Sequence, residues 1–401
     1  MNTHAPSRRA CRRVAALILS LAAGVASGDE TKTLNVVNFT AGPLAVDGGL
    51  VVTGAGGLRL KSLSLGANAR LVIDPVRTPV AVEGAPSFAE GAKIALAKRY
   101  AGVTRARFVI ATWSGETAVP LGLFDKSSVA GEAAATVEAA PDGKSRQLVV
   151  TVGDFGSSPK MRILALGDSI TQGVQKPEQA EYGFPQYRTS LASLLAANGV
   201  KAQMIGTRKN SQLDAALVQA PKEWIHHFGW SGITAGGLLG KKDSWVKDGE
   251  TPDFVTMLIG TNDINHRKKE GKTSEVAASE VYGAWKKLVD AVAARWPDAK
   301  IVLATILDRD FYNEGPIGHD TVVTVNDMIR ADYKAGRLPK NVVLVDMYEK
   351  CPLSGEGVFF DDKLHPNWKG QMAMAEAFFE AIVNSARKGP ISRRGDPAKG
   401  S

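Results

Sequence analysis

The chain has 401 residues, of which 44% are hydrophobic and 22% charged. This composition argues against general disorder, and the length allows two domains with sizeable cores. The formal net charge of +8 suggests an acidic partner, but basic residues at the two ends account for all of it and leave the intervening chain neutral. No nucleic-acid-binding motif accompanies the basic tail, residues 387–401, so we expect a solvated, disordered end and no nucleic-acid partner.

Residues 1–28 have the layout of a secretory signal peptide. Four arginines precede an apolar run, residues 14–25, and small residues follow at 26–28. The run is shorter than the roughly 20 apolar residues that a membrane-spanning helix needs. We therefore expect cleavage near residues 26–28, export to the periplasm or the medium, and a mature chain without a membrane span. Cleavage would leave Cys351 as the only cysteine, so no intramolecular disulfide is expected.

Residues 33–153 form a β-rich accessory region. Short apolar alternations such as Leu58-Arg59-Leu60 are separated by Gly, Asn, Asp and Pro clusters, which is typical of an all-β sandwich or a solenoid-like stack. The region is expected to bind polysaccharide, to cap the following domain or to act as a spacer; the sequence leaves all three open. Residues 154–160, which include Gly156-Ser157-Ser158-Pro159, are predicted to be a linker.

From residue 161 to residue 386 the pattern changes to apolar strands that alternate with longer amphipathic segments. This alternation predicts an α/β domain with a parallel sheet covered on both faces, in a flavodoxin-like doubly wound order. The predicted strands are residues 162–166, 202–205, 254–259, 301–306 and 342–345. Helices are predicted around residues 185–198, 234–240, 274–296, 321–335 and 368–386.

The first predicted strand of this domain runs into Gly167-Asp168-Ser169. Such a turn places a hydroxyl at the carboxyl end of a parallel strand, where open α/β sheets bind ligands. Ser169 is therefore a candidate nucleophile. Three further blocks follow in order: Gly229-Trp230-Ser231-Gly232, Gly260-Thr261-Asn262-Asp263 and Asp362-Lys363-Leu364-His365-Pro366.

Together the four blocks resemble those of the SGNH (GDSL-type) hydrolase superfamily, over about residues 160–386. The resemblance implies a three-layer α/β/α sandwich and a serine hydrolase that needs no cofactor and no metal. A serine nucleophile needs a base and a group that orients the base. The spacing of Asp362 and His365 suits these two roles, and Asp361 is a less favoured orienting residue because it lies one residue off the family's spacing. Pro366 is expected in the first turn of the last helix.

The resemblance also assigns the oxyanion hole, which stabilises the negative charge that develops during attack on an ester. Its donors would be the backbone N–H of Ser169, the backbone N–H of Gly232 and the side-chain amide of Asn262. The glycine block can be aligned in more than one way, so Gly229 remains an alternative backbone donor.

Several residues in or beside these blocks have two open interpretations. Asp168 and Asp263 are expected to organise their turns through backbone hydrogen bonds rather than to transfer protons. His226 and His227 are expected to line an acyl or sugar pocket. A metal site is the more specific but less favoured interpretation of this pair. Three aromatic residues are expected either to form a wall for a sugar ring or to pack in the core: Tyr182, Trp230 and Trp368.

Within the superfamily, the Tyr187-Arg188 pair and the segment His227-Phe228-Gly229-Trp230-Ser231-Gly232 look most similar to carbohydrate acetylesterases, acetyl xylan esterases among them. The resemblance implies a secreted serine esterase that removes acetyl groups from carbohydrate through an acetyl-enzyme. Two alternatives stay open: a lysophospholipase or thioesterase acting on longer acyl chains, and a noncatalytic glycan-binding surface protein.

Overall fold

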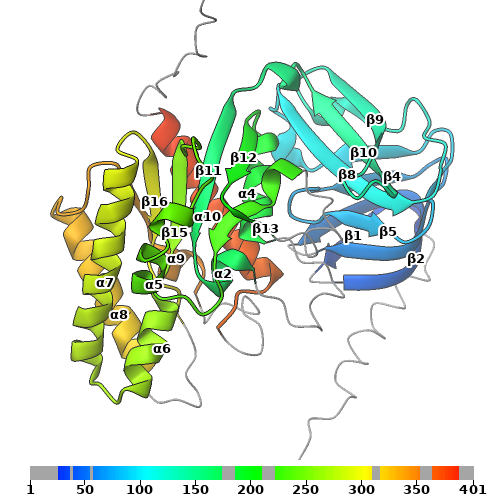
Figure 1. Ribbon diagram of the computed structural model, residues 1–401. Helices are drawn as coiled ribbons and strands as arrows, with labels where there is room; N and C mark the ends of the chain where they lie inside the picture. The colour runs from blue at the N-terminus through cyan, green and yellow to red at the C-terminus, as the bar shows by residue number, and fades with distance from the viewer. Residues whose placement is uncertain are drawn as a thin grey trace, which may run out of the picture.

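The computed structural model describes residues 26–36, 39–54, 57–173, 186–209, 222–308, 317–352 and 364–387. Figure 1 shows a β-rich part, coloured blue to blue-green, beside a part in which helices pack around a second sheet. The mixed α/β class and the β-rich N-terminal region are as predicted. The predicted signal peptide up to residue 25 and the basic tail from residue 388 lie outside the described residues.

The β-rich part holds a ten-stranded sheet, in which the path β7-β4-β2-β3-β5-β8-β10-β9 is joined by β1 and β6. It begins at Ala26, before the predicted boundary at residue 33. Its strands are β1 Ala26–Val36, β2 Phe39–Gly54, β3 Leu58–Leu65, β4 Arg70–Ile73, β5 Val80–Val82, β6 Ser87–Phe88, β7 Lys93–Leu96, β8 Ala106–Ser114, β9 Ala133–Ala139 and β10 Ser145–Val152. Short 3-10 helices are η1 Lys98–Tyr100, η2 Lys126–Ser128 and η3 Phe155–Ser157, the last within the predicted linker.

Most strand pairs in this sheet are parallel and repeat at a nearly constant spacing along the chain. Phe39 lies beside Leu58, Leu58 beside Val80, and Arg70 beside Lys93, so these partners are 19, 22 and 23 residues apart. Parallel pairing at such a spacing means that the chain coils and each coil stacks on the one before, as in a solenoid. Only β8, β9 and β10 pair antiparallel among the described strands of this sheet. Of the two arrangements that the sequence left open, the pairing is that of a solenoid-like stack.

The second part is built on a seven-stranded sheet with the order β13-β14-β11-β15-β16-β17, in which β12 also pairs with β11. All pairs except β13 with β14 are parallel. Its strands are β11 Lys160–Gly167, β12 Lys201–Ile205, β13 Arg208–Lys209, β14 His226–Gly229, β15 Phe254–Leu258, β16 Lys300–Ala304 and β17 Val342–Val345. Each of the five predicted strands is present, and β11 lies between β12 and β15 as a doubly wound order requires.

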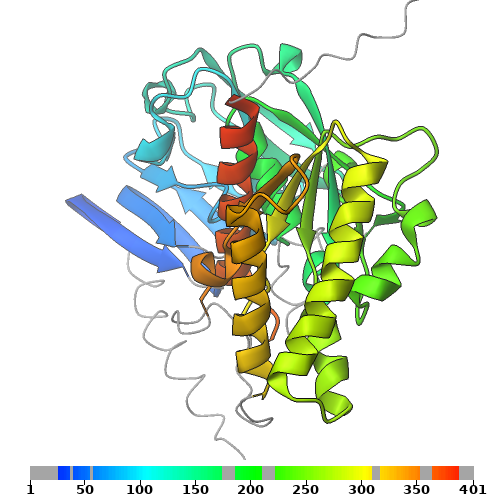
Figure 2. The same cartoon turned by 90° about the vertical axis from the view of Figure 1, so that its left-hand side faces the viewer.

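Helices cover this sheet and its ends (Figures 1 and 2). They are α2 Ser169–Gln172, α4 Tyr187–Ala196, α5 Ala235–Leu239, α6 Thr261–Lys269, α7 Ser274–Arg295, α8 Ile317–Lys334, α9 Met347–Lys350 and α10 Trp368–Arg387, with the 3-10 helices η4 Lys222–Trp224 and η5 Lys242–Ser244. Alternate residues of β11 belong to two different apolar cores: Ile163 and Ala165 to one, Leu164 and Leu166 to the other. Both faces of the strand are therefore buried, as expected for a parallel sheet.

One of these two cores continues from the second part into the β-rich part. It contains Ile163 of β11 and Phe378 of α10 together with Leu60 of β3 and Phe108 of β8. Helix α4 lies at the junction, contacting α10, β12 and β8, and nine of its ten residues are buried. A helix buried on all sides needs neighbours on all sides. The β-rich part therefore covers a face of the α/β part that would otherwise be exposed to water.

The sequence missed several short elements. Strand β14 has the sequence His-His-Phe-Gly, and its two histidines interrupt the apolar pattern expected of a strand. Helix α6 follows β15 and was missed because many of its residues are polar. Pro366 was expected in the first turn of the last helix, but α10 begins at Trp368. Instead Asn367 precedes the helix, and its side chain accepts a hydrogen bond from the Gly370 N–H at 3.2 Å. Among the described helices, none is long and apolar enough to span a membrane.

The shared core predicts that the two parts unfold together. Phe108 is 2% exposed and packs edge-on against Tyr100, with ring centroids 4.9 Å apart. Phe108→Ala should lower the free energy of unfolding by about 3–5 kcal/mol. Differential scanning calorimetry of the full chain should show a single transition that moves to lower temperature. A second transition that the substitution leaves in place would show that the α/β part has an independent core.

Candidate functional site

The candidate site lies where three neighbouring strands, β14, β11 and β15, end at the same edge of the sheet. Strand β11 ends at Gly167, Asp168 follows, and α2 begins at Ser169. Gly167 is needed for packing, because a Cβ there would lie 2.2 Å from Thr171 Oγ1 and 2.3 Å from the Leu258 carbonyl oxygen. The glycine therefore allows α2 to turn back onto the strand ends and hold Ser169 at the edge.

Ser169 and His365, which are 196 residues apart in sequence, are brought together in this structure. The Ser169 Oγ lies 2.9 Å from His365 Nε2. This distance lets the hydroxyl donate to an unprotonated Nε2, which is the starting geometry for an imidazole that takes the proton from a serine nucleophile. Ser169 is 7% exposed, and His365 is half-buried.

The other predicted member of the triad, Asp362, lies outside the described residues, as does its alternative, Asp361. Their orienting role remains a prediction. Tyr182, one of the three aromatic residues considered for a sugar wall, is also outside the described part of the chain.

The three predicted oxyanion donors lie on segments that converge at this edge. The Ser169 N–H is the first of α2, and no described residue accepts a hydrogen bond from it or from the Gly232 N–H. Gly232 is exposed and has a φ of +76°, a conformation that favours glycine. The Asn262 amide donates one hydrogen bond to the Ile233 carbonyl oxygen at 3.0 Å, which leaves its second N–H for a ligand.

Gly229, the alternative backbone donor, has its N–H engaged. It donates to Nδ1 of His227 at 2.9 Å. The role of Gly229 is to permit a close approach, since a Cβ there would lie 2.3 Å from the Gln172 backbone nitrogen. Of the two alignments of the glycine block, the geometry favours Gly232.

The two histidines of this block lie on β14. His227 is fully buried, and desolvation lowers the pKa of its imidazole, so the ring is neutral. His226 Nδ1 lies 3.1 Å from the Gly206 carbonyl oxygen. No group of three or more His, Cys, Asp or Glu side chains in the described residues is arranged to hold a metal ion.

Asp168 and Asp263 make the backbone hydrogen bonds expected of turn residues. Asp168 accepts from the Ile170 N–H at 3.0 Å, and both carboxylate oxygens of Asp263 accept from the Ala235 N–H, at 3.1 and 2.9 Å. Burial raises the pKa of Asp168 to about 7 and the pKa of Asp263 to about 6. Both carboxyl groups therefore lie in a desolvated layer beneath the site.

A buried arginine supports α2 from below, which the sequence did not reveal. Arg188 is fully buried and donates from Nε to the Thr171 carbonyl oxygen at 2.8 Å. It also bonds Gln186, whose Nε2 donates to the Gly173 carbonyl oxygen at 3.2 Å. In the sequence, the Tyr187-Arg188 pair is part of the resemblance to a family. In the structure, Arg188 holds the end of α2, a role that the pattern of residue types does not show.

The two described aromatic candidates have defined surroundings. Trp230 is 38% exposed, but the Arg208 Cζ and the Lys241 Nζ lie 4.0 and 4.3 Å from its ring centroid. Both cations therefore lie within the distance of a cation–π contact with this ring. Trp368 is 1% exposed and packs in the interior, the other role considered for it.

The described part of the site thus combines a serine hydroxyl, an imidazole within hydrogen-bond distance of it, and three N–H groups on the converging segments. This set has the chemical parts for acyl transfer through a serine nucleophile with an oxyanion hole.

Comparison with known proteins places this site within a family. The model of the GDSL-like lipase/acylhydrolase family matches residues 165–373, more than half of the chain. A multidomain esterase from Ruminococcus flavefaciens is 26% identical over 240 residues, which are 55% of this chain and 28% of the relative. The chain therefore spans little more than a quarter of that relative's length.

Similar solved structures include a carbohydrate esterase family 3 protein from Talaromyces cellulolyticus, with 20% identity and a TM-score of 0.44, covering 57% of this chain and 99% of that one. An acetyl xylan esterase variant from Geobacillus stearothermophilus has 20% identity and a TM-score of 0.39, covering 55% of this chain and 94% of that one.

The close approach at Gly229 can be tested by adding a methyl group. Gly229→Ala should push α2 away from β14 and displace Ser169, and a displacement of about 1 Å costs about 100-fold in rate. The measurement is the rate at which a fluorophosphonate labels Ser169. Gly236→Ala is the matched control, because nothing lies within 4 Å of the added Cβ in α5. Equal labelling of both variants would contradict the assigned role.

The buried carboxyl of Asp168 predicts a pH-dependent stability. Its folded pKa, about 7, exceeds the value of about 3.9 in an unfolded chain. The stabilisation is therefore fully present below about pH 4 and is lost as the pH rises through 7. Urea unfolding from pH 4 to 8 should show a steeper loss of unfolding free energy in the wild type than in Asp168→Asn. Asp290→Asn, at an exposed position of α7, should follow the wild type; identical slopes for all three proteins would refute the prediction.

Proposed function

The chain belongs to the GDSL-like lipase/acylhydrolase family, and from this premise we propose that it is an exported serine esterase that removes acetyl groups from carbohydrate. The observation that carries the proposal is the 2.9 Å distance between Ser169 Oγ and His365 Nε2. Esterase chemistry is also supported by the relative from Ruminococcus flavefaciens, which is named as an esterase.

In this mechanism His365 takes the proton of Ser169 as its Oγ attacks the ester carbonyl carbon. The carbonyl oxygen becomes an oxyanion that accepts hydrogen bonds from the Ser169 N–H, the Gly232 N–H and the Asn262 amide. Collapse expels the sugar alcohol, which receives the proton from the imidazolium, and leaves an acetyl group on Oγ. His365 then activates a water molecule that releases acetate and regenerates the hydroxyl. Asp362 is proposed to orient His365.

The carbohydrate substrate is proposed from the family subgroup that the Tyr187-Arg188 pair and the segment 227–232 resemble. We also propose that the α/β part is an SGNH three-layer sandwich with the parallel sheet in the middle. The signal-peptide pattern of residues 1–28 supports export, which would bring the enzyme to extracellular polysaccharide. Acetylated xylan is the natural first substrate to test.

The test is release of acetate from p-nitrophenyl acetate and from acetylated xylan by residues 29–401, with p-nitrophenyl octanoate as a control for chain length. Ser169→Ala should abolish hydrolysis of both acetyl esters by removing the nucleophile, a loss of about 10⁴-fold or more. Acetyl esters should be preferred over octanoate.

Rapid octanoate cleavage with intact acetyl-xylan would instead identify a lipase-like or thioesterase-like enzyme, because a long acyl groove gains about 0.8 kcal/mol for each buried methylene. Absence of any Ser169-dependent hydrolysis would reject the esterase. If the wild type hydrolyses no ester but binds insoluble xylan, pectin, mannan or chitin, a glycan-binding role would be favoured.

A further inference from the structure

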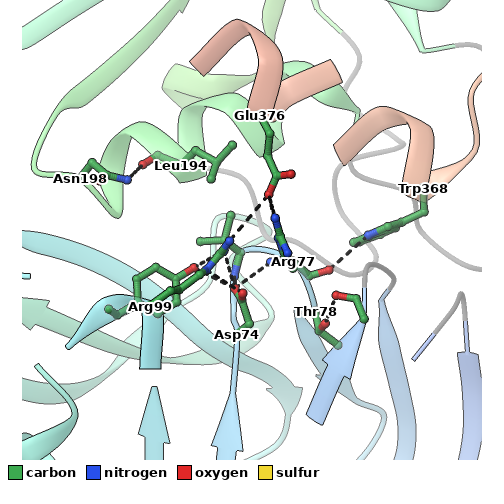
Figure 3. Close-up of polar contacts among 11 residues, drawn as sticks. Asp74, Arg77, Thr78, Arg99, Leu194, Asn198, Trp368 and Glu376 are labelled. Carbon is green, nitrogen blue, oxygen red and sulfur yellow. Dashed lines mark hydrogen bonds and ion pairs between the residues drawn. The ribbon is translucent and has the colours of Figure 1, made fainter. Parts of the chain in front are cut away.

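The β-rich part contacts α10, the helix that begins three residues after His365. The contact is made by the loop after β4, residues 74–78, and is drawn in Figure 3. The Trp368 indole N–H, at the first residue of α10, donates to the Arg77 carbonyl oxygen at 3.3 Å. Two turns later, Glu376 accepts from Arg77 Nε at 2.7 Å and also bonds Arg77 Nη2. One loop of the β-rich part therefore holds α10 at two points.

Asp74 fixes the conformation of this loop. It is 8% exposed, and its Oδ1 accepts hydrogen bonds from the Arg77 N–H at 3.1 Å and from the Tyr100 hydroxyl at 2.8 Å. Arg99 pairs with both Asp74 carboxylate oxygens at 2.8 Å, and its Nη1 lies 3.7 Å from Glu376 Oε1. The loop thus presents a preformed surface to α10, so the contact costs little ordering of its backbone.

A second connection joins the start of α10 to the His365 segment. The Gln371 side chain accepts from the Tyr187 N–H at 2.8 Å and donates from Nε2 to the Pro366 carbonyl oxygen at 3.3 Å. Gln371 is in the first turn of α10, and Pro366 directly follows His365. A shift of the first turn of α10 would therefore move the segment that carries the His365 imidazole. Ser169 lies on α2 and would not move with it, so the distance between the two side chains would change.

We propose that the β-rich part is a positioning element of the active site: its 74–78 loop holds the first turns of α10 and, through them, keeps His365 at bonding distance from Ser169. Arg77 acts through Trp368 and Glu376 and is a positioning residue. This inference rests on the proposed esterase function for its catalytic consequence, and the ordering of the His365 segment can be measured without it.

The experiment compares the full chain with Arg77→Met, Arg77→Lys and Arg107→Met. Arg107→Met is the matched control, because Arg107 makes an ion pair of 2.8 Å with Glu138 inside the β-rich part. Hydrogen exchange is followed in the peptide covering residues 364–372, and kcat and KM are measured for p-nitrophenyl acetate, well below the melting temperature.

Arg77→Met should raise exchange in this peptide about fivefold and lower kcat about tenfold, with KM within twofold of the wild type. The pH dependence of kcat/KM should change in Arg77→Met and should match that of the wild type in Arg107→Met. Arg77→Lys should recover much of the activity by restoring a cation opposite Glu376. Trp368→Phe, which keeps an aromatic ring but removes the donor to Arg77, should resemble Arg77→Met.

Equal exchange and equal kcat in Arg77→Met and Arg107→Met would overturn the proposal, as would a fall in kcat that both variants share. If the wild type hydrolyses no ester, the proposed esterase function fails, and the exchange comparison still decides whether the loop orders the His365 segment.

Discussion

The site depends on one contact, the meeting of Ser169 with His365 across 196 residues of chain. Different contacts hold each of these two residues in position. Ser169 is held by packing of α2 against the ends of β11 and β14, where Gly167 and Gly229 leave no room for a side chain. His365 precedes α10, so its position depends on where that helix begins. An error of about 1 Å on either side would cost about 100-fold in rate.

Buried polar side chains beneath the site hold α2 and the neighbouring turns in place. Arg188 holds the carbonyl end of α2 from within the core, and the desolvated Asp168 and Asp263 organise the turns around it. Hydrogen bonds in such a low-dielectric layer are strong when they are made and costly when they are lost. The polar residues under Ser169 therefore fix the geometry of the site without needing to touch a substrate.

The β-rich part packs closely against the α/β part. A common apolar core joins them, α4 is buried between them, and the Asp74–Arg99–Arg77–Glu376 contacts tie the loop after β4 to α10. The region that the sequence predicts to be an accessory domain therefore packs against α10, the helix that follows His365. This arrangement links the stability of the solenoid-like stack to the geometry at Ser169.

The sequence by itself determined the local features: the apolar strands, the amphipathic helices, and the order of the blocks that contain Ser169, Gly232, Asn262 and His365. These could be predicted because periodicity and turn residues act over a few positions. It could not distinguish a sandwich from a solenoid, since strand pairing joins residues 19 to 23 positions apart through backbone hydrogen bonds that depend little on the identity of the side chains.

Only the tertiary structure shows that the Gly229 N–H, one of the two candidate backbone donors, already has an acceptor in His227 Nδ1. It also decided that Trp368 is buried against the β-rich part and that Arg77 faces Glu376, 299 positions away in sequence. Such contacts follow from the packing of whole layers. No local pattern encodes them, since the free energy of burial depends on what covers a residue and not on its neighbours in the chain.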